Sequence, residues 1–321
     1  MEYKAETVTI DQIDENDLTY RITTQTNNDD LAASIKEIGV LNSPIIEKRD
    51  ADAHFIILSG FRRINACKAL KVRQIKARIA SSKLTQLDRA KIAISENSFQ
   101  RALNPIETSR ALNLLSGLMD NKDRLSKTAS RFALPGNPKL IDSIMQLTVL
   151  PDPIQQTVIS GTVGLPVALH LGKMEKTVAL MLLEIFENLK FSLNKQRELI
   201  LFSEEISQRE DKALIDVLKD PRIDAIINNK DMDRSQKGRE LRRYLKQRRF
   251  PELSHAESVF EKEKKALKLE NQIRFQPPLH FEGETYTFQF QFRTVREYKK
   301  RLETLNRLVD HASFTKIMTR P

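Results

Sequence analysis

The sequence predicts a mostly helical α+β chain with three domains: a small α/β domain over residues 1–100, an all-helical domain over residues 101–250, and a helix-strand-strand-helix domain over residues 251–321. Three observations support this prediction. Short β-type runs alternate with helical runs up to about residue 80. From residue 86 to about 250 the apolar spacing is almost wholly helical, and alternating strand patterns return only after that.

The composition favours a polyanionic partner. The chain has 321 residues, which is enough for two or three domains rather than one core. Lys and Arg outnumber Asp and Glu by 53 to 43, so the formal net charge is +10. A basic chain attracts polyanions such as nucleic acids.

Several classes of protein are disfavoured. No apolar run reaches about eighteen residues and the first residues are acidic, so we expect a cytoplasmic protein without a membrane span. Cys67 is the single cysteine, which excludes a disulfide frame and a Cys-based zinc site and predicts a buried, inert thiol. The five histidines show no i, i+4 pair, so no histidine metal site is expected.

In the first domain Gly60 stands at a strand-to-helix junction, "FIILSGFRRINACKAL", ahead of Arg62 and Arg63. A glycine lets a ligand approach the backbone, and the first amides of a helix favour an anion. Guanidinium forks match phosphate oxygens. The stretch "GFRR" therefore predicts a phosphate site; a strand, a glycine and a helix with surface arginines are the structural alternative.

A second motif, "ENSFQRALNPIE", places Glu96 and Asn97 at the end of one helix, before another that Asn104 caps with Pro105 and Glu107. Adjacent carboxylate and carboxamide groups offer oxygen ligands to Mg²⁺, the usual companion of a triphosphate. A solvated helix end is the alternative.

A third motif, "DRLSKTASRFALPGNPKLIDSIMQL", predicts two short helices around a Gly-containing turn, the second opened by Asn137 and Pro138. This is the build of a helix-turn-helix, whose second helix enters the major groove; a plain helical bundle is the alternative. Leu140, Ile144 and Leu147 are expected to face the core. The residues expected to contact DNA are Arg124, Lys127 and Arg131 for phosphates, and Lys139, Asp142, Ser143 and Gln146 for base edges.

A basic stretch, "GRELRRYLKQRRF", ends the middle domain. It predicts a helix that grips DNA without regard to sequence, and a solvated helix face explains it equally well. Against Glu240 it carries six cations: Arg239, Arg242, Arg243, Lys246, Arg248 and Arg249.

In the last domain "YTFQFQF" alternates aromatic with polar residues, which predicts a strand with one aromatic face. The final helix, over residues 295–309, carries an apolar stripe that includes Tyr298, Leu302 and Leu308. Packing within the chain and packing on a second copy both explain this stripe.

Together, in this order, these motifs resemble the ParB (ParB/RepB-type) family of chromosome and plasmid partition proteins. The resemblance runs from Leu31 to Leu171, with "GFRRINACKAL" for the family's Gly-Glu-Arg-Arg box, "ENSFQRALNPIE" for its Glu-Asn box, and "LPDPIQQTVISG" after the helix-turn-helix. It implies an amino-terminal domain that binds CTP with Mg²⁺, a helix-turn-helix that reads a short palindromic DNA site, and a carboxy-terminal domain that holds a homodimer. Such a protein is a nucleotide-switched clamp on the DNA of the nucleoid.

The resemblance also assigns residues. Glu96 and Asn97 would hold Mg²⁺ and act in any slow CTP hydrolysis, and Gly39 belongs to the segment that lines the base. A ParA-type partner ATPase stays open, because the chain has no clear arginine-rich amino-terminal motif for stimulating one. The residues assigned to CTP are Arg21, Gly39, Gly60, Arg62, Arg63, Glu96 and Asn97.

The chain departs from the family pattern at two positions. Phe61 replaces the glutamate of the Gly-Glu-Arg-Arg box, and Asn65 stands where a third arginine is common. A lost charge-assisted phosphate contact costs about 1.5–3 kcal/mol, roughly ten- to a hundredfold in affinity. These departures favour a nucleotide-independent transcription regulator as one alternative. A ParB-like nuclease is another, and it needs a general base near Glu96.

Overall fold

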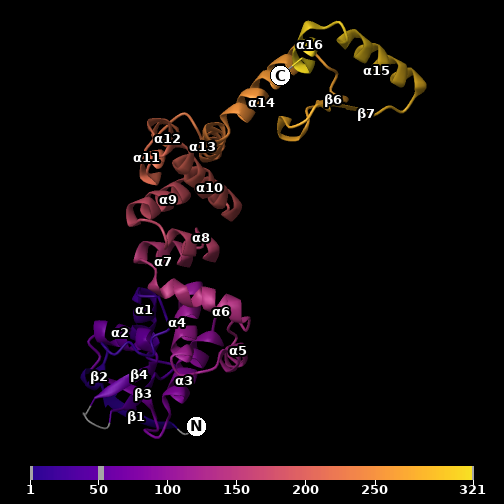
Figure 1. Ribbon diagram of the computed structural model, residues 1–321. Coiled ribbons are helices and arrows are strands. Elements are labelled where there is room, and N and C mark those ends of the chain that lie inside the picture. Colours follow the sequence, from indigo (N-terminus) through magenta and orange to yellow (C-terminus); the bar gives the residue numbers. More distant parts are fainter. Residues whose placement is uncertain (1–2, 50–53, 320–321) are drawn as a thin grey trace. The chain divides into compact units, whose positions relative to one another are not determined.

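The computed structural model describes residues 3–49 and 54–319, and the chain divides into two compact units (Figure 1). The first unit is Met1–Glu187 and the second is Asn188–Pro321. The mostly helical α+β class predicted from the sequence is confirmed. The domain boundaries near residues 100 and 250 stay predictions. Within the described ranges no helix is long and apolar enough to cross a lipid bilayer.

The first unit begins with a five-stranded mixed sheet in the order β1-β5-β3-β4-β2. The pairs β1/β5 and β3/β4 are antiparallel, whereas β3/β5 and β2/β4 are parallel. The sheet and its helices are β1 (Tyr3–Thr9), η1 (Ile10–Gln12), β2 (Ile13–Asp14), α1 (Asp29–Ile38), β3 (Ile45–Lys48), β4 (Phe55–Ser59), α2 (Phe61–Ala69) and β5 (Gln74–Ala80).

The core of this α/β part lies between the sheet and the helices α1 and α2. Apolar side chains from central strands, such as Ile46 and Ile57, pack with Ile64 and Cys67 of α2. The expected burial of Cys67 is confirmed, and this burial raises the pKa of its thiol.

Helices complete the first unit. The predicted start of α4 is confirmed, because the Glu107 amide donates to Asn104 Oδ1 at 2.9 Å and the Asn104 amide donates to the Glu107 carboxylate at 3.1 Å. The elements are α3 (Gln86–Ser98), α4 (Pro105–Ser116), α5 (Lys122–Arg131), α6 (Pro138–Met145), η2 (Gln146–Val149), α7 (Asp152–Ile159) and α8 (Leu165–Leu171); α9 (Lys176–Leu189) extends past the unit boundary.

The second unit contains a helical part and a small sheet. Its α14 begins at Pro251, because proline lacks an N–H and fits the first helical position. The elements are α10 (Leu193–Glu210), α11 (Leu214–Leu218), α12 (Pro221–Ile227), α13 (Arg234–Arg249), α14 (Pro251–Ala266), β6 (Ile273–Gln276), η3 (Leu279–Phe281), β7 (Thr287–Phe290), α15 (Val295–Leu308) and α16 (Ala312–Met318).

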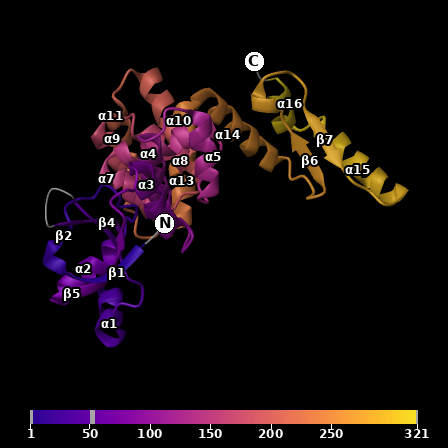
Figure 2. The same ribbon diagram turned by 90° about the horizontal axis from the view of Figure 1, so that it is seen from below.

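The strands β6 and β7 form an antiparallel pair (Figure 2). The aromatic face predicted for β7 packs inward at Tyr286 and Phe288, whereas Phe292 remains exposed. Phe288 stacks on Phe275 with ring centroids 4.3 Å apart, and Phe260 of α14 joins the same cluster. The helix α16, which was not expected from the sequence, contributes Ile317 and Phe314 to this core.

Candidate functional site

Gly60 makes the turn from β4 into α2. Its backbone is left-handed, with φ 100° and ψ 20°, a conformation that L side chains rarely adopt. A Cβ at this position would lie 2.7 Å from Pro44 Cβ and 3.0 Å from Pro44 Cα. Both the conformation and the close approach therefore require glycine here.

The Gly60 turn borders a cavity of about 210 Å³, called here the Gly60 hollow. Two motifs that are distant in the chain meet in it, and five of the residues assigned to CTP by resemblance are among its lining: Gly60, Arg62, Arg63, Glu96 and Asn97. The other lining residues are Ile22, Thr23, Gln25, Leu31, Asn42, Ser59, Phe61, Gln100 and Arg101. The roles of these residues in binding stay predictions.

Neutral partners hold Arg62 and Arg63, two of the three arginines of the hollow. Arg62 donates from Nε to Asn28 Oδ1 at 3.0 Å and from Nη2 to the Asn27 carbonyl at 3.1 Å. Arg63 donates from Nη1 to the Asn42 carbonyl at 2.6 Å, and burial lowers its pKa. Arginine remains charged at neutral pH even so. Since neither guanidinium pairs with a carboxylate of the described chain, both positive charges are available to an anion.

The helix α3 supplies the oxygen groups of the hollow. Arg78 Nη2 lies 3.2 Å from Glu96 Oε2, and Asn97 donates from Nδ2 to the Ala93 carbonyl at 2.8 Å. The Asn97 amide can therefore present its Oδ1 atom to a cation. Over the described ranges no group of three or more His, Cys, Asp or Glu residues is arranged for a metal ion. A cation at Glu96 would complete its ligands with phosphate oxygens and water.

Arg101, which lines the hollow, forms an ion pair with the buried Glu107 that sequence analysis missed. Arg101 binds Glu107 through two contacts of 2.6 and 2.7 Å, and Glu107 is fully buried. The carboxylate also accepts from the Thr24 amide at 2.9 Å. Burial alone would raise the pKa of Glu107, but the hydrogen bonds outweigh it and the pKa is lowered. The sequence indicated Glu107 only as a helix-capping residue.

Arg21 and Gly39 are not among the residues that line the Gly60 hollow. Arg21 lines a second cavity of about 650 Å³ together with Arg110 of α4, called here the Arg21 hollow. Gly39 ends α1 with φ 79°, and a Cβ placed there would meet no atom within 4 Å. Their assignment to CTP stays a prediction.

Phe61 belongs to the protein core. Its side chain is 7% exposed, packs in the same cluster as Ile64, and forms an apolar part of the wall of the Gly60 hollow. Asn65 on the same helix is half-buried. The hollow therefore carries an aromatic ring where the family has a carboxylate.

The helices α5 and α6 form the predicted pair around a tight turn. Asn137 caps α6 and accepts from the Leu140 amide at 3.1 Å, and Ser126 Oγ donates to the Gly136 carbonyl. A Cβ on Gly136 would lie 2.1 Å from Ser130 Oγ, so a larger residue in the turn would require the Ser130 side chain to rotate. The local geometry of a helix-turn-helix is therefore present.

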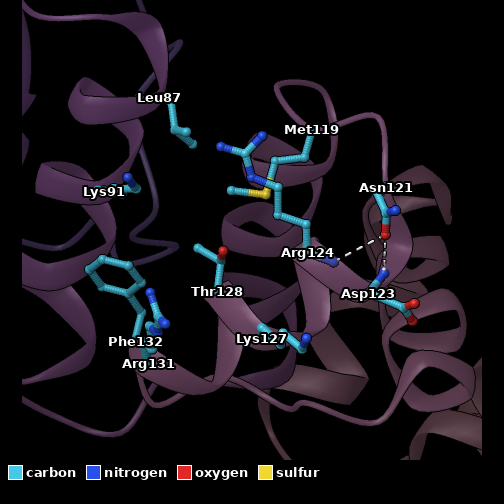
Figure 3. A pocket seen from close by; sticks show the side chains of 10 residues that line it. All are labelled: Leu87, Lys91, Met119, Asn121, Asp123, Arg124, Lys127, Thr128, Arg131 and Phe132. Atoms are coloured by element: carbon cyan, nitrogen blue, oxygen red, sulfur yellow. Dashed lines mark hydrogen bonds between the residues drawn. The ribbon is translucent and has the colours of Figure 1, made fainter.

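A cavity of about 830 Å³ lies beside α5, called here the α5 hollow (Figure 3). Lys91 of α3, which sequence analysis missed, lines it opposite α5 together with the three predicted phosphate contacts, Arg124, Lys127 and Arg131. Among the described residues none of these four cations forms an ion pair, and Asp123 is the single acidic residue of the lining. The hollow is strongly basic.

The predicted base-reading residues, on α6 and at Gln146 directly after it, lie at the surface to different degrees. Lys139 and Gln146 are exposed, whereas Ser143 is half-buried. Ser143 Oγ donates to the Lys139 carbonyl at 3.0 Å, and Gln146 Nε2 donates to the Asp142 carbonyl at 3.1 Å. Reading of base edges would require both side chains to give up these intrahelical bonds.

One residue of α6 was placed wrongly from the sequence. Leu140 was expected to face the core, but its side chain is 42% exposed. The buried stripe is formed by Ile141, Ile144 and Leu147, which are spaced by three residues. Leu140 lies one turn before Ile144 on the same face, but it stands in the first turn of α6, where its side chain is not covered.

The basic helix α13 is paired with carboxylates of its own unit. Arg248 lies 2.6 Å from Glu210 and 3.0 Å from Asp220. The further pairs are Arg242 with Glu198 at 2.5 Å, Lys246 with Glu257 at 2.9 Å, Arg249 with Glu205 at 2.6 Å, and Arg243 with Glu240. The predicted DNA contacts of Arg242 and Arg243 stay predictions, but both side chains already have anionic partners.

The stripe on α15 divides between core and surface. Leu308 is buried with the aromatic cluster, whereas Tyr298 and Leu302 are 38% and 37% exposed. Phe292 and Val295, near the start of the helix, are also exposed. The intramolecular explanation therefore covers one end of the stripe and leaves an apolar surface at the other.

Residues 2–98 match the family model described as the ParB N-terminal domain. The chain carries a ParB N-terminal domain. This match includes the sheet, α1, α2 and α3, and hence both motifs of the Gly60 hollow. The ParB-type resemblance predicted from the sequence is confirmed.

Two curated relatives carry the description "probable chromosome-partitioning protein ParB". The ParB of Treponema pallidum (strain Nichols) is 27% identical over 141 residues, which are 44% of this chain and 41% of the relative. The ParB of Campylobacter jejuni subsp. jejuni is 39% identical over 83 residues, which are 26% of this chain and 28% of the relative. The chain thus spans less than half the length of either relative.

Solved ParB structures are similar at low identity. A C-terminally truncated ParB from Caulobacter crescentus complexed with CTP-gamma-S is 23% identical, with 55% of this chain and 96% of that chain covered and a TM-score of 0.28. The same protein complexed to the centromeric parS site is 17% identical, with coverages of 60% and 96% and a TM-score of 0.35. These scores are too low to establish a common arrangement of the whole chains.

Proposed function

We propose that the chain is a DNA-binding partition protein of the ParB type that closes around DNA as a homodimer when CTP and Mg²⁺ bind. One observation carries this proposal: the Gly60 motif, "GFRR", and the Glu96 motif, "ENSFQRALNPIE", line the same hollow. Guanidiniums without a carboxylate partner, beside a helix start, favour phosphate groups. The choice of CTP rests on the resemblance to the family, whereas the phosphates and the cation rest on residues of this chain.

The donor set of the hollow fits a triphosphate and its cation. Arg62 and Arg63 would bind phosphate oxygens, and the Glu96 carboxylate and Asn97 Oδ1 would hold Mg²⁺, which usually keeps one or two protein ligands beside phosphate and water. A bound Mg²⁺ would neutralise part of the phosphate charge. Glu96 is the one carboxylate among the described lining residues, so any hydrolysis is expected to be slow.

The size of the hollow suggests how a nucleotide would enter. Its volume of about 210 Å³ is below the usual range of small-molecule sites, about 300–1,000 Å³. It has room for phosphate groups, and the base would lie outside it. Arg62 holds the segment at Asn27 and Asn28 through two hydrogen bonds. We therefore expect a bound nucleotide to replace these hydrogen bonds with contacts from Arg62 to phosphate oxygens, and the released segment to move.

Calorimetric titration of the full chain with CTP and Mg²⁺ tests the proposal. Wild type is expected to bind, and Arg63→Ala to weaken binding at least about tenfold, because a charge-assisted contact is lost. Lys36→Ala, which removes an exposed cation of α1, is the matched control and should bind like wild type. Absence of binding by wild type to any nucleoside triphosphate would remove the nucleotide switch.

DNA binding is proposed for the α5 hollow and α6. The four unpaired cations of the α5 hollow favour contact with phosphates, which positions a protein on the duplex, and α6 would then read bases. The exposed apolar end of α15 supports the proposed homodimer. Sedimentation of the full chain tests this point, with Tyr298→Glu expected to shift a dimer to a monomer.

A nucleotide-independent transcription regulator is the second candidate. The buried Phe61 favours it, because a core residue replaces the family's glutamate in the wall of the Gly60 hollow. The same titration separates the two candidates, since a regulator of this kind binds DNA without any nucleotide. For a nuclease, the described lining offers no histidine or aspartate as a general base beside Glu96, so labelled DNA is expected to stay intact with Mg²⁺ or Mn²⁺.

A further inference from the structure

The Arg21 hollow is separate from the Gly60 hollow and lies between the segment before α1 and the helices α4 and α7. Its volume of about 650 Å³ is within the range of small-molecule sites, about 300–1,000 Å³. Two guanidiniums, from Arg21 and Arg110, line it. Ile22 belongs to the walls of both hollows, so the chain at this residue separates the two cavities.

Arg110 is held in place but is not neutralised by an ion pair. Its Nη1 donates to the Thr23 carbonyl at 2.8 Å. Burial lowers its pKa, and the positive charge of Arg21 lowers it further. Glu107 and Asp152 act in the opposite direction, and their effects are smaller than that of Arg21. The two arginines therefore repel each other inside a partly desolvated cavity.

Arg21 leaves a donor unused. Its Nε atom is buried and has no hydrogen-bond partner among the described residues. Buried donors of native proteins are nearly always satisfied, and an unsatisfied one often indicates a missing ligand or water. No carboxylate of the described chain forms an ion pair with this guanidinium.

The charge of the hollow is positive. Asp152, at the start of α7, is the acidic residue of its lining and faces two cations. Glu107 is nearby, but Arg101 holds its carboxylate through two hydrogen bonds. Hydroxyl and amide groups, including Thr24 and Gln155, and four apolar residues complete the lining. An oxyanion would relieve the repulsion and satisfy the orphaned donor.

We propose that the Arg21 hollow binds a small molecule through an oxyanion group, a phosphate or a carboxylate, independently of the nucleotide site. Arg21 and Arg110 hold the oxyanion, and neighbouring hydroxyls and amides contact the remainder of the molecule. The ligand would tie the segment before α1 to α4 and α7.

NMR of the ¹⁵N-labelled full chain tests this proposal, because arginine Nε–H signals report on single side chains. The Arg21 signal is identified by its loss in Arg21→Gln. Inorganic phosphate and succinate are titrated separately, which distinguishes a phosphate from a carboxylate ligand. One of them is expected to shift the Arg21 signal with saturation.

Variants connect the shift to the site. Arg110→Gln is expected to raise the Kd measured at Arg21 at least about tenfold, as for the loss of a charge-assisted contact. Lys36→Gln removes one exposed cation of the same unit and is expected to leave this Kd unchanged. Circular dichroism checks that each variant is folded.

Two results would overturn the proposal. One is an Arg21 signal that neither probe shifts, which would mean that the two arginines have a structural role only. The other is a shift that appears only with CTP and Mg²⁺ and is lost in Arg63→Gln, which would make Arg21 part of the nucleotide site. Wild-type crystals soaked with tungstate add a measurement without variants: an anomalous peak against Arg21 and Arg110 is expected, and peaks at other positions alone count against the site.

Discussion

The helices α5 and α13 both carry several cations, but their surroundings differ. Three cations of α5, Arg124, Lys127 and Arg131, line an open hollow and form no ion pair among the described residues. The fourth, Lys122 at the start of the helix, pairs with Asp142 at 2.8 Å. On α13, Arg248 binds both Glu210 and Asp220, and its neighbours on the helix have carboxylate partners as well. The three cations of α5 that line the hollow therefore present uncompensated charge to a ligand, whereas Arg242, Arg243 and Arg248 of α13 do not.

The difference teaches that a basic segment must be judged together with the elements packed on it. The helix α10 carries Glu198, Glu205 and Glu210, which reach the arginines of α13. A paired guanidinium would have to leave its carboxylate behind, partly desolvated, in order to bind a phosphate. The pairs on α13 act in stability, whereas Arg124, Lys127 and Arg131 of α5 are free to act in binding.

The largest expected effect is on the stability of the second unit. Arg248→Met should lower its free energy of unfolding by about 2 kcal/mol, because Glu210 and Asp220 lose their shared partner in a largely buried position. Hydrogen exchange of the α10 and α13 amides in the full chain measures this loss. Exchange rates equal to those of wild type would contradict a structural role for the pairs.

The same pairs predict a pH dependence. Hydrogen bonds from Arg248 lower the pKa of Glu210 to about 2, against the opposing effect of burial. Stability from an acid with a depressed pKa is fully present above its ordinary pKa and is lost as the pH falls toward the folded value. Protection of α10 amides should therefore decrease from pH 5 to pH 2 in wild type, and less so in Arg248→Met. An identical decrease in both proteins would show that protonation of Glu210 does not cause the loss of protection.

The next effect is on DNA affinity. Lys127→Ala and Arg131→Ala should each weaken binding about tenfold at low salt, on all DNA sequences alike, because each removes a phosphate contact. Each should also reduce the slope of log affinity against log salt by about 0.9. Fluorescence anisotropy on specific and random duplexes measures both quantities. A loss confined to one sequence would indicate base reading by α5 instead.

The smallest effect is expected on α13. Arg242→Ala and Arg243→Ala should change DNA affinity less than about twofold, because both side chains are already paired. The same anisotropy assay, beside the α5 variants, provides the comparison. A tenfold loss here would mean that these pairs open on DNA and that the two helices act alike.

Local signals in the sequence predicted local structure well. Asn104 and Asn137 begin helices where expected, and both accept hydrogen bonds as caps. Gly60 stands at a sharp strand-to-helix turn, and Cys67 is buried. Each of these features depends on a few consecutive residues, so the pattern contains the information needed.

Long-range partners were not predicted. The pairs on α13, the contact between Arg101 and Glu107, and the position of Lys91 in the α5 hollow all join side chains from different elements. The misplaced Leu140 has the same origin, because helical spacing puts it on the buried face, and only the packed neighbours decide whether its end of that face is covered.

The sequence by itself determined the helical class, the order of the motifs and the local turns, because spacing, caps and glycines act over a few residues. Only the tertiary structure decided which charges remain free. It brought the Gly60 and Glu96 motifs to one hollow, placed Arg21 in another and paired α13 with α10. The physical reason is that the interaction energy of a charge depends on the ions and the solvent around it, and segments far away in the chain determine both.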